Sequence, residues 1–462
     1  MCLFSGEEMD YCSKQEPQRW GGGEDTTGLN QEAVGISPAT FGAAATKPVI
    51  AALLCLAALA QMWRICALLP ARATRCDFSI YYMSAVSLHQ GLNPYKTDFR
   101  SLGRQLGLEA WDIYHATDPP PFVLLISPLA LMRERVAYYT WIGINALMFA
   151  ATLGLLFGRT AGLGGRAGLV LTALALMYPP VHIHFFQAQS KILILFLLVL
   201  MMRSMERGWD RAAGLSLACA GLLRAFPLLL IGYLAVQRRR RALLWTFIGL
   251  AAGGIVTIAW LGVDVSLSFR DGAALLTSQR WLNIRGNIGL AANVSRLFLD
   301  EAGNNPGSAL RLARLFSMSV VNLAVLGVTI WVTLGLEPRR DPDWAAFSMW
   351  VVASVLLSPM AGVHCMVLFL IPFAQIAAAA CRSHASTRVQ WLALTSYALI
   401  AVTMILRIAV PSIEFDQTEL VASLNDVVVK EWLVTSILLY LATCFFARDE
   451  TQKLFSDNLQ EQ

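Results

Sequence analysis

Charged residues are scarce in this chain of 462 residues. Only 15% of its residues are charged, against about 25% in soluble domains, and 56% are hydrophobic. The apolar residues fall in uncharged runs from Val49 nearly to the C-terminus. Such runs predict one integral membrane domain. The net charge of +5 is mild and comes from arginine clusters between the runs, so no nucleic-acid partner is implied.

Patterns that hold disulfides, metals or nucleotides are also missing. The nine cysteines stand singly, without a CxxC or zinc-type pair. His182 and His184 have a spacing that a metal could use, but no carboxylate or cysteine lies nearby in sequence. Asp341-Pro342-Asp343 spells the DxD metal motif, yet it follows two arginines in a short loop expected in the cytosol, and we interpret it as chance. No glycine-rich phosphate loop opens a helix after a strand, so a soluble nucleotide-binding fold has no support. From these patterns together we predict no metal and no cofactor.

The N-terminal region lacks both the basic start and the nearby apolar core that a secretory signal requires. It carries acidic residues among Gly, Gln and Thr. We therefore expect residues 1–46 to form a disordered cytosolic tail. Residues 47–448 are the predicted membrane domain, and residues 449–462 are a second cytosolic tail.

Long apolar runs predict a bundle of membrane-spanning helices. A span needs about 20 apolar residues, because a helix rises about 1.5 Å per residue and must cross about 30 Å of hydrocarbon. Five runs plainly meet this length: Pro48–Leu69, Val136–Phe157, Ala242–Val263, Leu315–Leu336 and Val389–Leu406. Shorter or interrupted candidates are Ala167–Met177, Ile192–Met202, Ala212–Val236 and Trp432–Ala447. We predict an all-α polytopic membrane protein with about 10 to 13 spans.

Arginine clusters give the orientation of this bundle. The positive-inside rule places the Arg238–Arg241 run and the Arg339-Arg340 pair in the cytoplasm. Residues 71–120 and 264–311 then form two large loops that face outward. We expect these loops to carry short interfacial helices.

Two apolar stretches are interrupted. The stretch Trp344–Cys381 is too long for one span and contains Ser358-Pro359, so it predicts two helices that meet at this break. The simplest count of spans leaves Arg203, Arg207 and Arg211 on the outside, against the positive-inside rule. That conflict disappears if Phe122–Met132 is re-entrant or if Ala212–Val236 is two short pieces, and the sequence leaves both open.

The first outer loop opens with an aspartate and a run of aromatic residues. Apolar side chains recur there at helical spacing, at Phe78, Tyr81, Tyr82, Ala85 and Leu88. With Gly91 as a stop, they predict a short amphipathic helix on the membrane face. Asp77 stands at its start. Its carboxylate either caps the helix or acts as a general base that takes a proton from a hydroxyl.

Several motifs follow one another in a specific order: Asp77-Phe78-Ser79-Ile80-Tyr81-Tyr82, Gly91-Leu92-Asn93-Pro94-Tyr95, Asp118-Pro119-Pro120-Pro121-Phe122, Gln187-Ala188-Gln189, Leu223-Arg224-Ala225-Phe226-Pro227, Asn287, Ser358-Pro359 and His364. From Ala45 to Pro372, this order resembles glycosyltransferase family 87. The resemblance implies a GT-C type helix bundle that takes a polyprenyl-phosphate sugar, usually mannose. It also assigns the role of catalytic base to Asp77.

The chain departs from the usual residues of that family at five positions. It has Ala188, Lys191, Arg224, Gly289 and Cys365 where the family often has Gly, Asn, Lys, Ser and His. These departures leave the general chemistry possible and bear on the identity of the donor and acceptor sugars.

Transfer from a polyprenyl phosphate needs a base for the acceptor hydroxyl and fixed positive charge for the departing phosphate. Arg224 is the candidate for the phosphate, because a guanidinium inside an apolar run costs about 2.5–3.5 kcal/mol. The alternative is that Arg224 snorkels to the interface beside Pro227. His364 follows the Ser358-Pro359 break, where it either bonds the substrate or packs against a neighbouring carbonyl. A single attack with one base predicts inversion at the anomeric carbon.

We therefore predict catalysis by Asp77, and substrate binding by Tyr81, Tyr82, Gln189, Arg224, Asn287 and His364. The predicted function is transfer of a sugar, in the family usually mannose, from a polyprenyl-phosphate donor to a glycolipid or glycan acceptor. We expect the reaction on the outer face of the cell membrane, which in this case is a bacterial inner membrane. The alternatives are a non-catalytic lipid-linked sugar transporter or flippase, or a scaffold in envelope synthesis. The expected partners are the lipid-linked sugar donor and the glycolipid or glycan acceptor, and the sequence leaves protein partners open.

Overall fold

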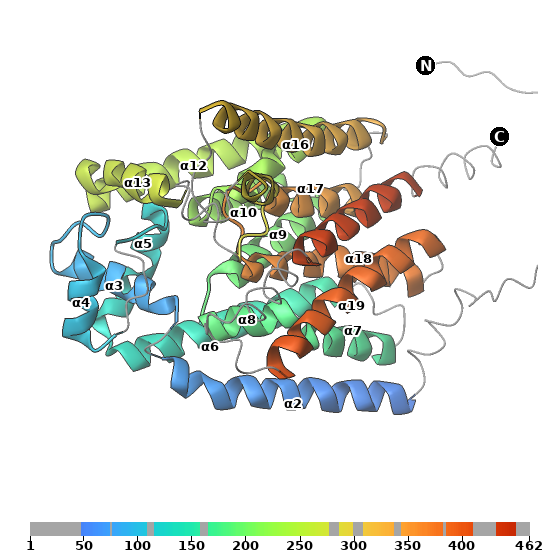
Figure 1. Ribbon diagram of the computed structural model, residues 1–462, viewed down its shortest axis with the longest axis horizontal. Helices are drawn as coiled ribbons and strands as arrows, with labels where there is room; N and C mark the ends of the chain where they lie inside the picture. The colour runs from blue at the N-terminus through green and yellow to red at the C-terminus, as the bar shows by residue number, and fades with distance from the viewer. Residues whose placement is uncertain are drawn as a thin grey trace, which may run out of the picture. The chain divides into compact units, whose positions relative to one another are not determined.

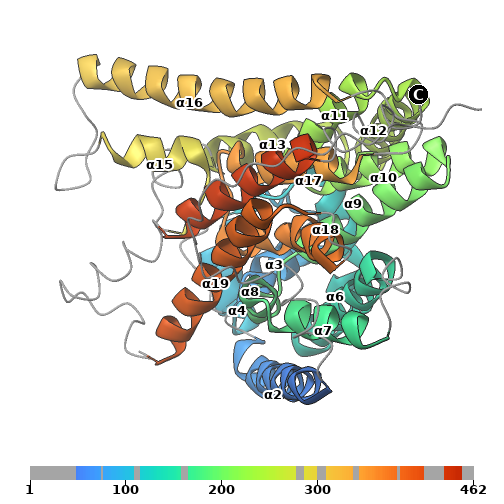
Figure 2. The ribbon, with the colours of Figure 1, turned by 90° about the vertical axis from the view of Figure 1, so that its right-hand side faces the viewer.

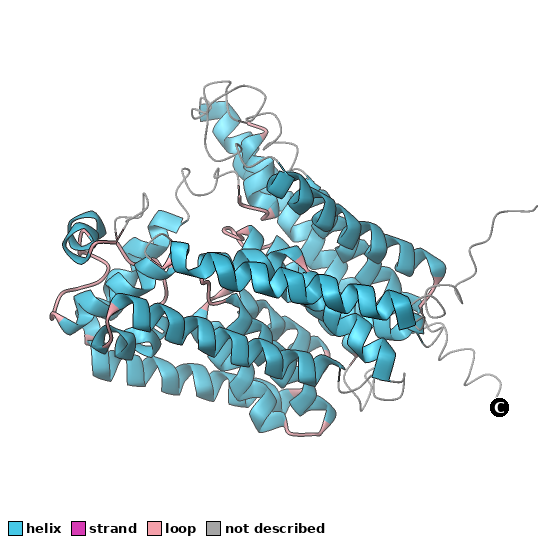
Figure 3. Cartoon of the chain, turned by 90° about the horizontal axis from the view of Figure 1, so that it is seen from below, coloured by secondary structure: helices cyan, strands magenta, loops and turns pink. Residues whose placement is uncertain are grey.

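Helices make up every regular element in the part of the chain that the structure describes (Figure 1, Figure 3). The computed structural model describes residues 48–73, 76–108, 115–157, 165–276, 286–298, 308–336, 343–381, 385–409 and 431–449. The predicted all-α fold class is confirmed. The two predicted tails, residues 1–46 and 449–462, lie outside these ranges except for Asp449.

The five long apolar runs are helices at the predicted places: α2 (Pro48–Arg72), α6 (Glu134–Phe157), α12 (Arg240–Leu261), α16 (Ser308–Leu334) and α19 (Thr387–Ala409). Among the described residues, six helices are long and apolar enough to cross a membrane. A seventh is added if α7 (Gly165–Met177) and α8 (Pro179–Gln187), which are bent by 50°, form one span. The chain is therefore a multi-pass membrane protein. Several further apolar helices are too short to be counted in this way, and the count covers the described residues only, so the total of 10 to 13 spans stays a prediction.

The short helices occupy the interior of the bundle. They are α9 (Lys191–Glu206), α10 (Asp210–Leu223), α11 (Leu230–Val236) and α17 (Trp344–Leu356). Even α9, the longest of them, rises only about 24 Å, less than the roughly 30 Å of a hydrocarbon core. In both views α9, α10 and α17 lie between α2 and α16 (Figure 1, Figure 2). Lys191, the first residue of α9, is thereby placed inside the protein.

Both predicted interruptions are present. Helix α10 ends at Leu223, and after Arg224 the chain continues as η3 (Phe226–Leu229) and α11. The stretch Ala212–Val236 is therefore two short pieces, one of the two alternatives that the sequence left open. Helix α17 ends before Ser358-Pro359, and the chain resumes as η4 (Val363–Phe369) and α18 (Leu370–Cys381).

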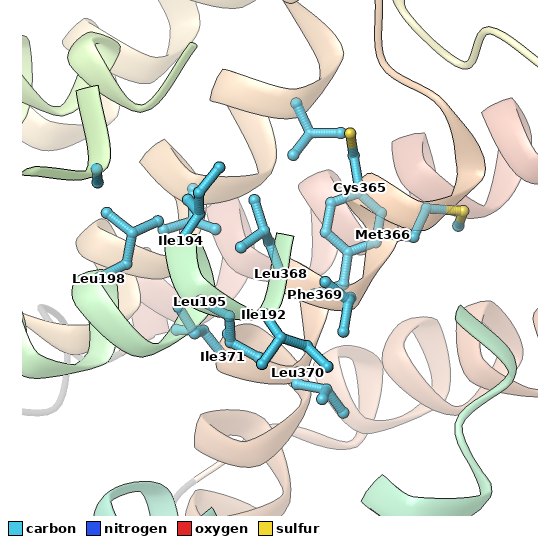
Figure 4. Packing of buried hydrophobic residues seen from close by; sticks show 14 of the residues in the cluster. Ile192, Ile194, Leu195, Leu198, Cys365, Met366, Leu368, Phe369, Leu370 and Ile371 are labelled. Atoms are coloured by element: carbon cyan, nitrogen blue, oxygen red, sulfur yellow. The ribbon is translucent and has the colours of Figure 1, made fainter. Parts of the chain in front are cut away.

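The core and the periphery differ in where their apolar side chains point. Helix α9 packs against η4 and the start of α18 (Leu370–Cys381), as Figure 4 shows. Ile192, Leu195, Met366 and Phe369 are all 0% exposed there. By contrast, α2 and α16 expose large apolar side chains, including Trp63, Leu315, Phe316 and Trp331. A helix that is apolar all round and buried belongs to a core, whereas exposed apolar faces in a membrane protein contact lipid.

The two predicted outer loops contact each other. The first loop contains α3 (Phe78–His89) and α4 (Phe99–Leu106) and is followed by α5 (Pro120–Ile126) and η1 (Ser127–Leu131). The second loop contains α15 (Leu290–Arg296) and all of α13 (Val263–Leu276) except its first residue. Lys96 Nζ lies 3.0 Å from Asp264 Oδ1, and the Asn93 amide donates to Asp264 Oδ2 at 3.0 Å. The ring of Tyr95 lies edge-on to Phe269. Residues from both loops thus share one side of the bundle, as the positive-inside assignment requires.

The C-terminal ends of α9 and α11 meet the start of α17 on the other side. Arg203 pairs with Glu206 at 2.8 Å, and Glu206 accepts a hydrogen bond from the Trp344 indole. The Tyr233 hydroxyl, one turn before the Arg238–Arg241 run, donates to the Asp343 carbonyl at 3.3 Å. Arg203 therefore lies on the side of that arginine run. The conflict with the positive-inside rule is resolved.

Helix α3 has the predicted extent but not the predicted setting. It covers Phe78–His89 and is followed by Gly91 at φ 70°. Nine of its side chains, including Ser79, Ser84 and Ser87, are buried, so it is covered on both faces instead of lying half-exposed on the membrane. The serines permit this burial, because Ser84 and Ser87 donate to the helix's own carbonyls at 2.7 and 3.0 Å. The prediction of an amphipathic surface helix was wrong.

Candidate active site

Asp77 stands at the N-cap of α3 but does not cap it. Its φ and ψ are −61° and −20°, and its side chain makes no capping bond. The amides of Ser79 and Ile80, which a capping carboxylate would bind, donate instead to the carbonyls of Cys76 and Asp77 at 2.9 and 3.1 Å. The carboxylate is therefore available for another partner. Its Oδ2 accepts a hydrogen bond from the amide of Gln189.

Gln189 holds the centre of a buried network. Its Oε1 accepts from the Tyr81 hydroxyl at 3.0 Å and from Lys191 Nζ at 3.2 Å, while its Nε2 donates to Asp77. Two donors on the oxygen and one acceptor on the nitrogen fix the orientation of this amide. The network connects α3 with the start of α9, although the two segments are more than 100 residues apart in sequence.

The turn between α8 and α9 holds Gln189 in place. Ala188 adopts the left-handed conformation at φ 50°, and the backbone N–H of Gln189 donates to the His184 carbonyl at 3.1 Å. The Trp141 indole donates to the Ala188 carbonyl at 2.9 Å. A glycine adopts this conformation without steric cost, which gives a physical reason why a Gly suits position 188.

Arg224 follows α10 and pairs with Asp118, just before α5. The exposed fractions of the two side chains are 19% and 3%, so the pair lies inside the protein. The snorkelling alternative is therefore not what the structure shows. Sequence reasoning did not foresee Asp118 as the partner, although a carboxylate bordering an apolar stretch is itself a sign of function or pairing.

Lys191 is a second cation beside Arg224, and sequence reasoning did not name it as a site residue. It is the first residue of α9 and is 3% exposed. Its charge acts on Asp77, Asp118 and Arg224, so two cations and two carboxylates share one buried region. The signal in the sequence was a lysine directly before the uncharged run Ile192–Met202, because an unpaired lysine at that place would be expensive to bury.

Burial raises the pKa of Asp77 to about 6. The hydrogen bond from Gln189 and the charges of Lys191 and Arg224 lower the pKa and limit the rise. A carboxyl group with this pKa is ionised at neutral pH and is more basic than an ordinary aspartate. Such a group suits general base catalysis, which works best when the pKa lies near the working pH.

His364 borders the network. Its Nδ1 lies 3.2 Å from Oε1 of Gln187, and its ring lies so close to Gly362 that any larger residue there would collide with it. The charges of Lys191 and Arg224 act on His364. The structure thus places His364 near both cations and gives it a side-chain partner in place of the backbone carbonyl considered above.

The other two predicted substrate-binding residues, Tyr82 and Asn287, form hydrogen bonds to the backbone of neighbouring segments. The Tyr82 hydroxyl donates to the Met132 carbonyl at 2.8 Å. Asn287 is 0% exposed, and its side chain joins two loop segments: it donates to the Pro359 carbonyl at 2.8 Å and accepts from the amides of Gly289 and Ala361 at 3.0 and 3.1 Å. These bonds give both residues a structural role. Their contact with substrate stays a prediction.

The potential metal motifs do not gather into a site. Among the residues that the structure describes, no three His, Cys, Asp or Glu side chains lie together as metal ligands would. His184 Nε2 lies 3.1 Å from the Asn145 amide oxygen. Asp343 caps α17 by accepting from the amides of Ala345 and Ala346 at 2.8 and 3.0 Å, while Asp341 lies outside the described residues.

The fold and the network define a class: a multi-pass helical membrane protein in which a basic carboxylate and two cations meet at the ends of short helices. The family model of glycosyltransferase family 87 matches residues 116–359, more than half of the chain. The chain therefore belongs to glycosyltransferase family 87 and is a membrane glycosyltransferase. A search of curated proteins found no match.

The matched segment contains only part of the network. Asp118, Gln189, Lys191 and Arg224 lie within residues 116–359, and so does Asn287. The residues outside it are Asp77, Tyr81, Tyr82 and His364. The bonds from Gln189 to Asp77 and from Tyr81 to Gln189 connect α3 and the residue before it to the matched segment.

Proposed function

We propose that this glycosyltransferase moves mannose from a polyprenyl-phosphate donor to a glycolipid or glycan acceptor on the outer face of a bacterial inner membrane. Asp77 is the general base, and transfer inverts the anomeric centre. The observation that carries the proposal is the Asp77 carboxylate, which leaves its helix uncapped and is held by Gln189 beside two buried cations.

The chemistry follows from these positions. The acceptor oxygen attacks the anomeric carbon, the bond from that carbon to the phosphate oxygen breaks, and Asp77 takes the proton of the acceptor hydroxyl. The polyprenyl phosphate leaves with the bonding electrons. Arg224 and Lys191 supply fixed positive charge for it, and burial in a region of low dielectric strengthens their effect.

The outward location of the reaction rests on the placement of the short helices. Lys191 begins α9, whereas Arg203 near its other end lies beside the cytoplasmic arginine run. Arg224 likewise stands at the end of α10 that is remote from its start at Asp210. The two cations therefore lie toward the side of the outer loops, where a lipid-linked donor presents its phosphate.

A direct assay tests the proposal. Purified full-length protein is incubated with polyprenyl-phosphate-mannose and a panel of glycolipid acceptors, and release of polyprenyl phosphate and mannosylated product are both measured. We expect release only with an acceptor present, and its loss in Asp77→Asn. A protein that carries the donor across a vesicle membrane without releasing polyprenyl phosphate would be a flippase and would overturn the proposal. Parallel donors with other sugars test the assignment of mannose.

A further inference from the structure

The start of α9 has hydrogen-bond donors without partners. Ser190 is the N-cap residue, at φ −101° and ψ 2°, and its side chain makes no capping bond. Its hydroxyl is 0% exposed, lies beside that of Tyr81, and has no hydrogen-bond partner of normal geometry among the described residues. A buried hydroxyl without a partner costs about 1–3 kcal/mol, so its retention points to a missing ligand.

Two cations stand next to this hydroxyl. Among the described residues, the Lys191 ammonium makes one hydrogen bond, to Gln189, although it carries three donors. Arg224 binds Asp118 through one terminal nitrogen, while its buried Nε has no partner in the described chain. The charge of Arg224 acts directly on Lys191. Donors from three residues are thus unfilled in one small buried region.

The direction of α9 adds to this positive potential. The first amides of a helix have no intrahelical acceptor, and the helix dipole places partial positive charge at that end. Helix α9 has 16 residues and begins with Ser190 and Lys191 at the network. Asp77 and Asp118 do not fill the site, because their bonds go to Gln189 and Arg224 and leave the Ser190 hydroxyl and the Arg224 Nε unpaired.

We propose that Ser190, Lys191 and Arg224 form the seat of the phosphate group of the polyprenyl-phosphate donor and product, at the start of α9. This inference rests on the proposed function and extends it, since it adds the Ser190 hydroxyl and the start of α9 to the two cations already assigned to the phosphate. The phosphate oxygens accept from the Ser190 hydroxyl, the Lys191 ammonium and the Arg224 guanidinium. Asp118 keeps Arg224 in position while the site is empty.

A binding experiment without any acceptor tests the phosphate seat. Radiolabelled short-chain polyprenyl monophosphate is titrated against purified full-length protein in detergent, with the uncharged polyprenol as the matched ligand. We expect Lys191→Met to weaken binding of the phosphate lipid about ten-fold or more, and Ser190→Ala about five-fold, because each removes a bond to a charged group. Lys191→Arg should regain part of the affinity. Binding of polyprenol should not change.

The controls separate the phosphate seat from the function on which it rests. Lys96→Met removes an exposed lysine that is paired with Asp264 in the outer loops and should leave the affinity unchanged. If the wild-type protein binds polyprenyl phosphate but both Ser190→Ala and Lys191→Met bind it equally well, the seat is wrong and the proposed function stands. If the wild-type protein does not distinguish polyprenyl phosphate from polyprenol, the proposed function fails.

Two further measurements keep the test decisive. Ser190→Ala changes no charge, so it remains informative even if Lys191→Met does not fold. In the full reaction it should raise the KM for the donor and leave the KM for the acceptor unchanged. If anionic phospholipid vesicles without polyprenyl lipid displace the ligand at equal concentration, the site takes any phospholipid headgroup and the assignment to the donor is overturned.

Discussion

Among the described helix starts, two pairs of N-cap residues, all of types that normally cap, contrast with each other. Asp98 caps α4 by accepting from the Arg100 amide at 3.0 Å, and Asp343 caps α17 through two amides. Asp77 at α3 and Ser190 at α9 make no capping bond. Both of the latter adjoin the Gln189 network, whereas the capping pair lies away from it.

The contrast shows where local rules give way to function. A carboxylate or hydroxyl at an N-cap normally satisfies a free amide, and it contributes about 0.5–2 kcal/mol by doing so. At α3 the backbone satisfies its own amides through carbonyls of the preceding turn, so the carboxylate can turn toward Gln189. Departures from local consistency are expected at functional sites. We therefore expect mutation of Asp77 or Ser190 to change transfer or donor binding, and mutation of Asp98 or Asp343 to change stability.

The largest effect is expected from Asp77→Asn. The amide keeps an acceptor for Gln189 and the size of the side chain, but it cannot take a proton from a hydroxyl. Transfer should fall by about 10²–10⁴-fold, the usual contribution of a general base. The thermal midpoint should stay at or above that of the wild type, because the variant no longer buries a charge. Asp98→Asn is the matched control and should retain full transfer; an equally active Asp77→Asn enzyme would sink the assignment.

Mutation of Arg224 should have the next largest effect, a loss of donor affinity. The test has to allow for Asp118, the buried carboxylate that pairs with Arg224. Arg224→Met leaves the Asp118 carboxylate buried and unpaired, which costs about 3–5 kcal/mol and puts folding at risk. The double variant Arg224→Met/Asp118→Asn removes both charges and should fold. It should lose most of its affinity for the donor, whereas Arg224→Lys should keep part of it because the charge remains.

The KM for the donor and the thermal midpoint are measured for Arg224→Met, Arg224→Lys and the double variant, and compared with those of the wild type. A double variant with wild-type donor affinity would show that Arg224 serves only to neutralise Asp118. A single Met variant as stable as the wild type would show that the ion pair contributes nothing to folding.

Much of the fold could be predicted from the sequence because it rests on local signals. The long uncharged runs gave the five long helices, and Ser358-Pro359 gave the break after α17. The setting of α3 could not be predicted in this way. Helical spacing of aromatic residues indicates one buried face, but the burial of the opposite face depends on serines that bond to their own helix.

The site was predictable only in part, for a similar reason. Motif order and a charge in an apolar run named Asp77, Gln189 and Arg224 as candidates, and the structure brings the three together. Their partners come from segments distant in sequence, and no single-sequence pattern pairs Arg224 with Asp118. Nor does the sequence show that the side-chain oxygen of Asn287 accepts hydrogen bonds from the backbone amides of Gly289 and Ala361. Pairing across a helix bundle requires the packing itself.

The pH dependence of transfer should follow the Asp77 carboxyl. Its pKa is raised to about 6 by burial, so the protonated form, which cannot accept a proton, dominates below that value. We expect kcat/KM to fall about ten-fold for each pH unit below the pKa and to reach a plateau above it. The residual transfer of Asp77→Asn should lack this acidic limb. A wild-type profile that is flat between about pH 5 and 8 would contradict the role of Asp77 as base.

Smaller effects are expected at the capping pair, and on stability instead of transfer. Asp98→Ala and Asp343→Ala should each cost about 0.5–2 kcal/mol, with Asp343 toward the upper end because its buried carboxylate accepts two bonds. Ser190→Ala should cost less than either, because no capping bond is lost. Thermal midpoints in the same detergent measure the order. A Ser190→Ala loss as large as that of Asp343→Ala would erase the distinction between the two pairs.

The smallest effect is expected from removal of divalent metal. Asp343 belongs to the Asp341-Pro342-Asp343 sequence, but its carboxylate is bonded to two helix amides, and Asp77 is bonded to Gln189. Neither carboxylate has an arrangement that needs a cation to complete it, and Arg224 and Lys191 already place positive charge beside Asp77. Transfer should therefore persist in excess chelator, and Asp343→Ala should remain active. If chelator abolishes transfer and added manganese or magnesium restores it, the reaction needs a metal as well as the two cations. The DxD sequence would then be part of the site.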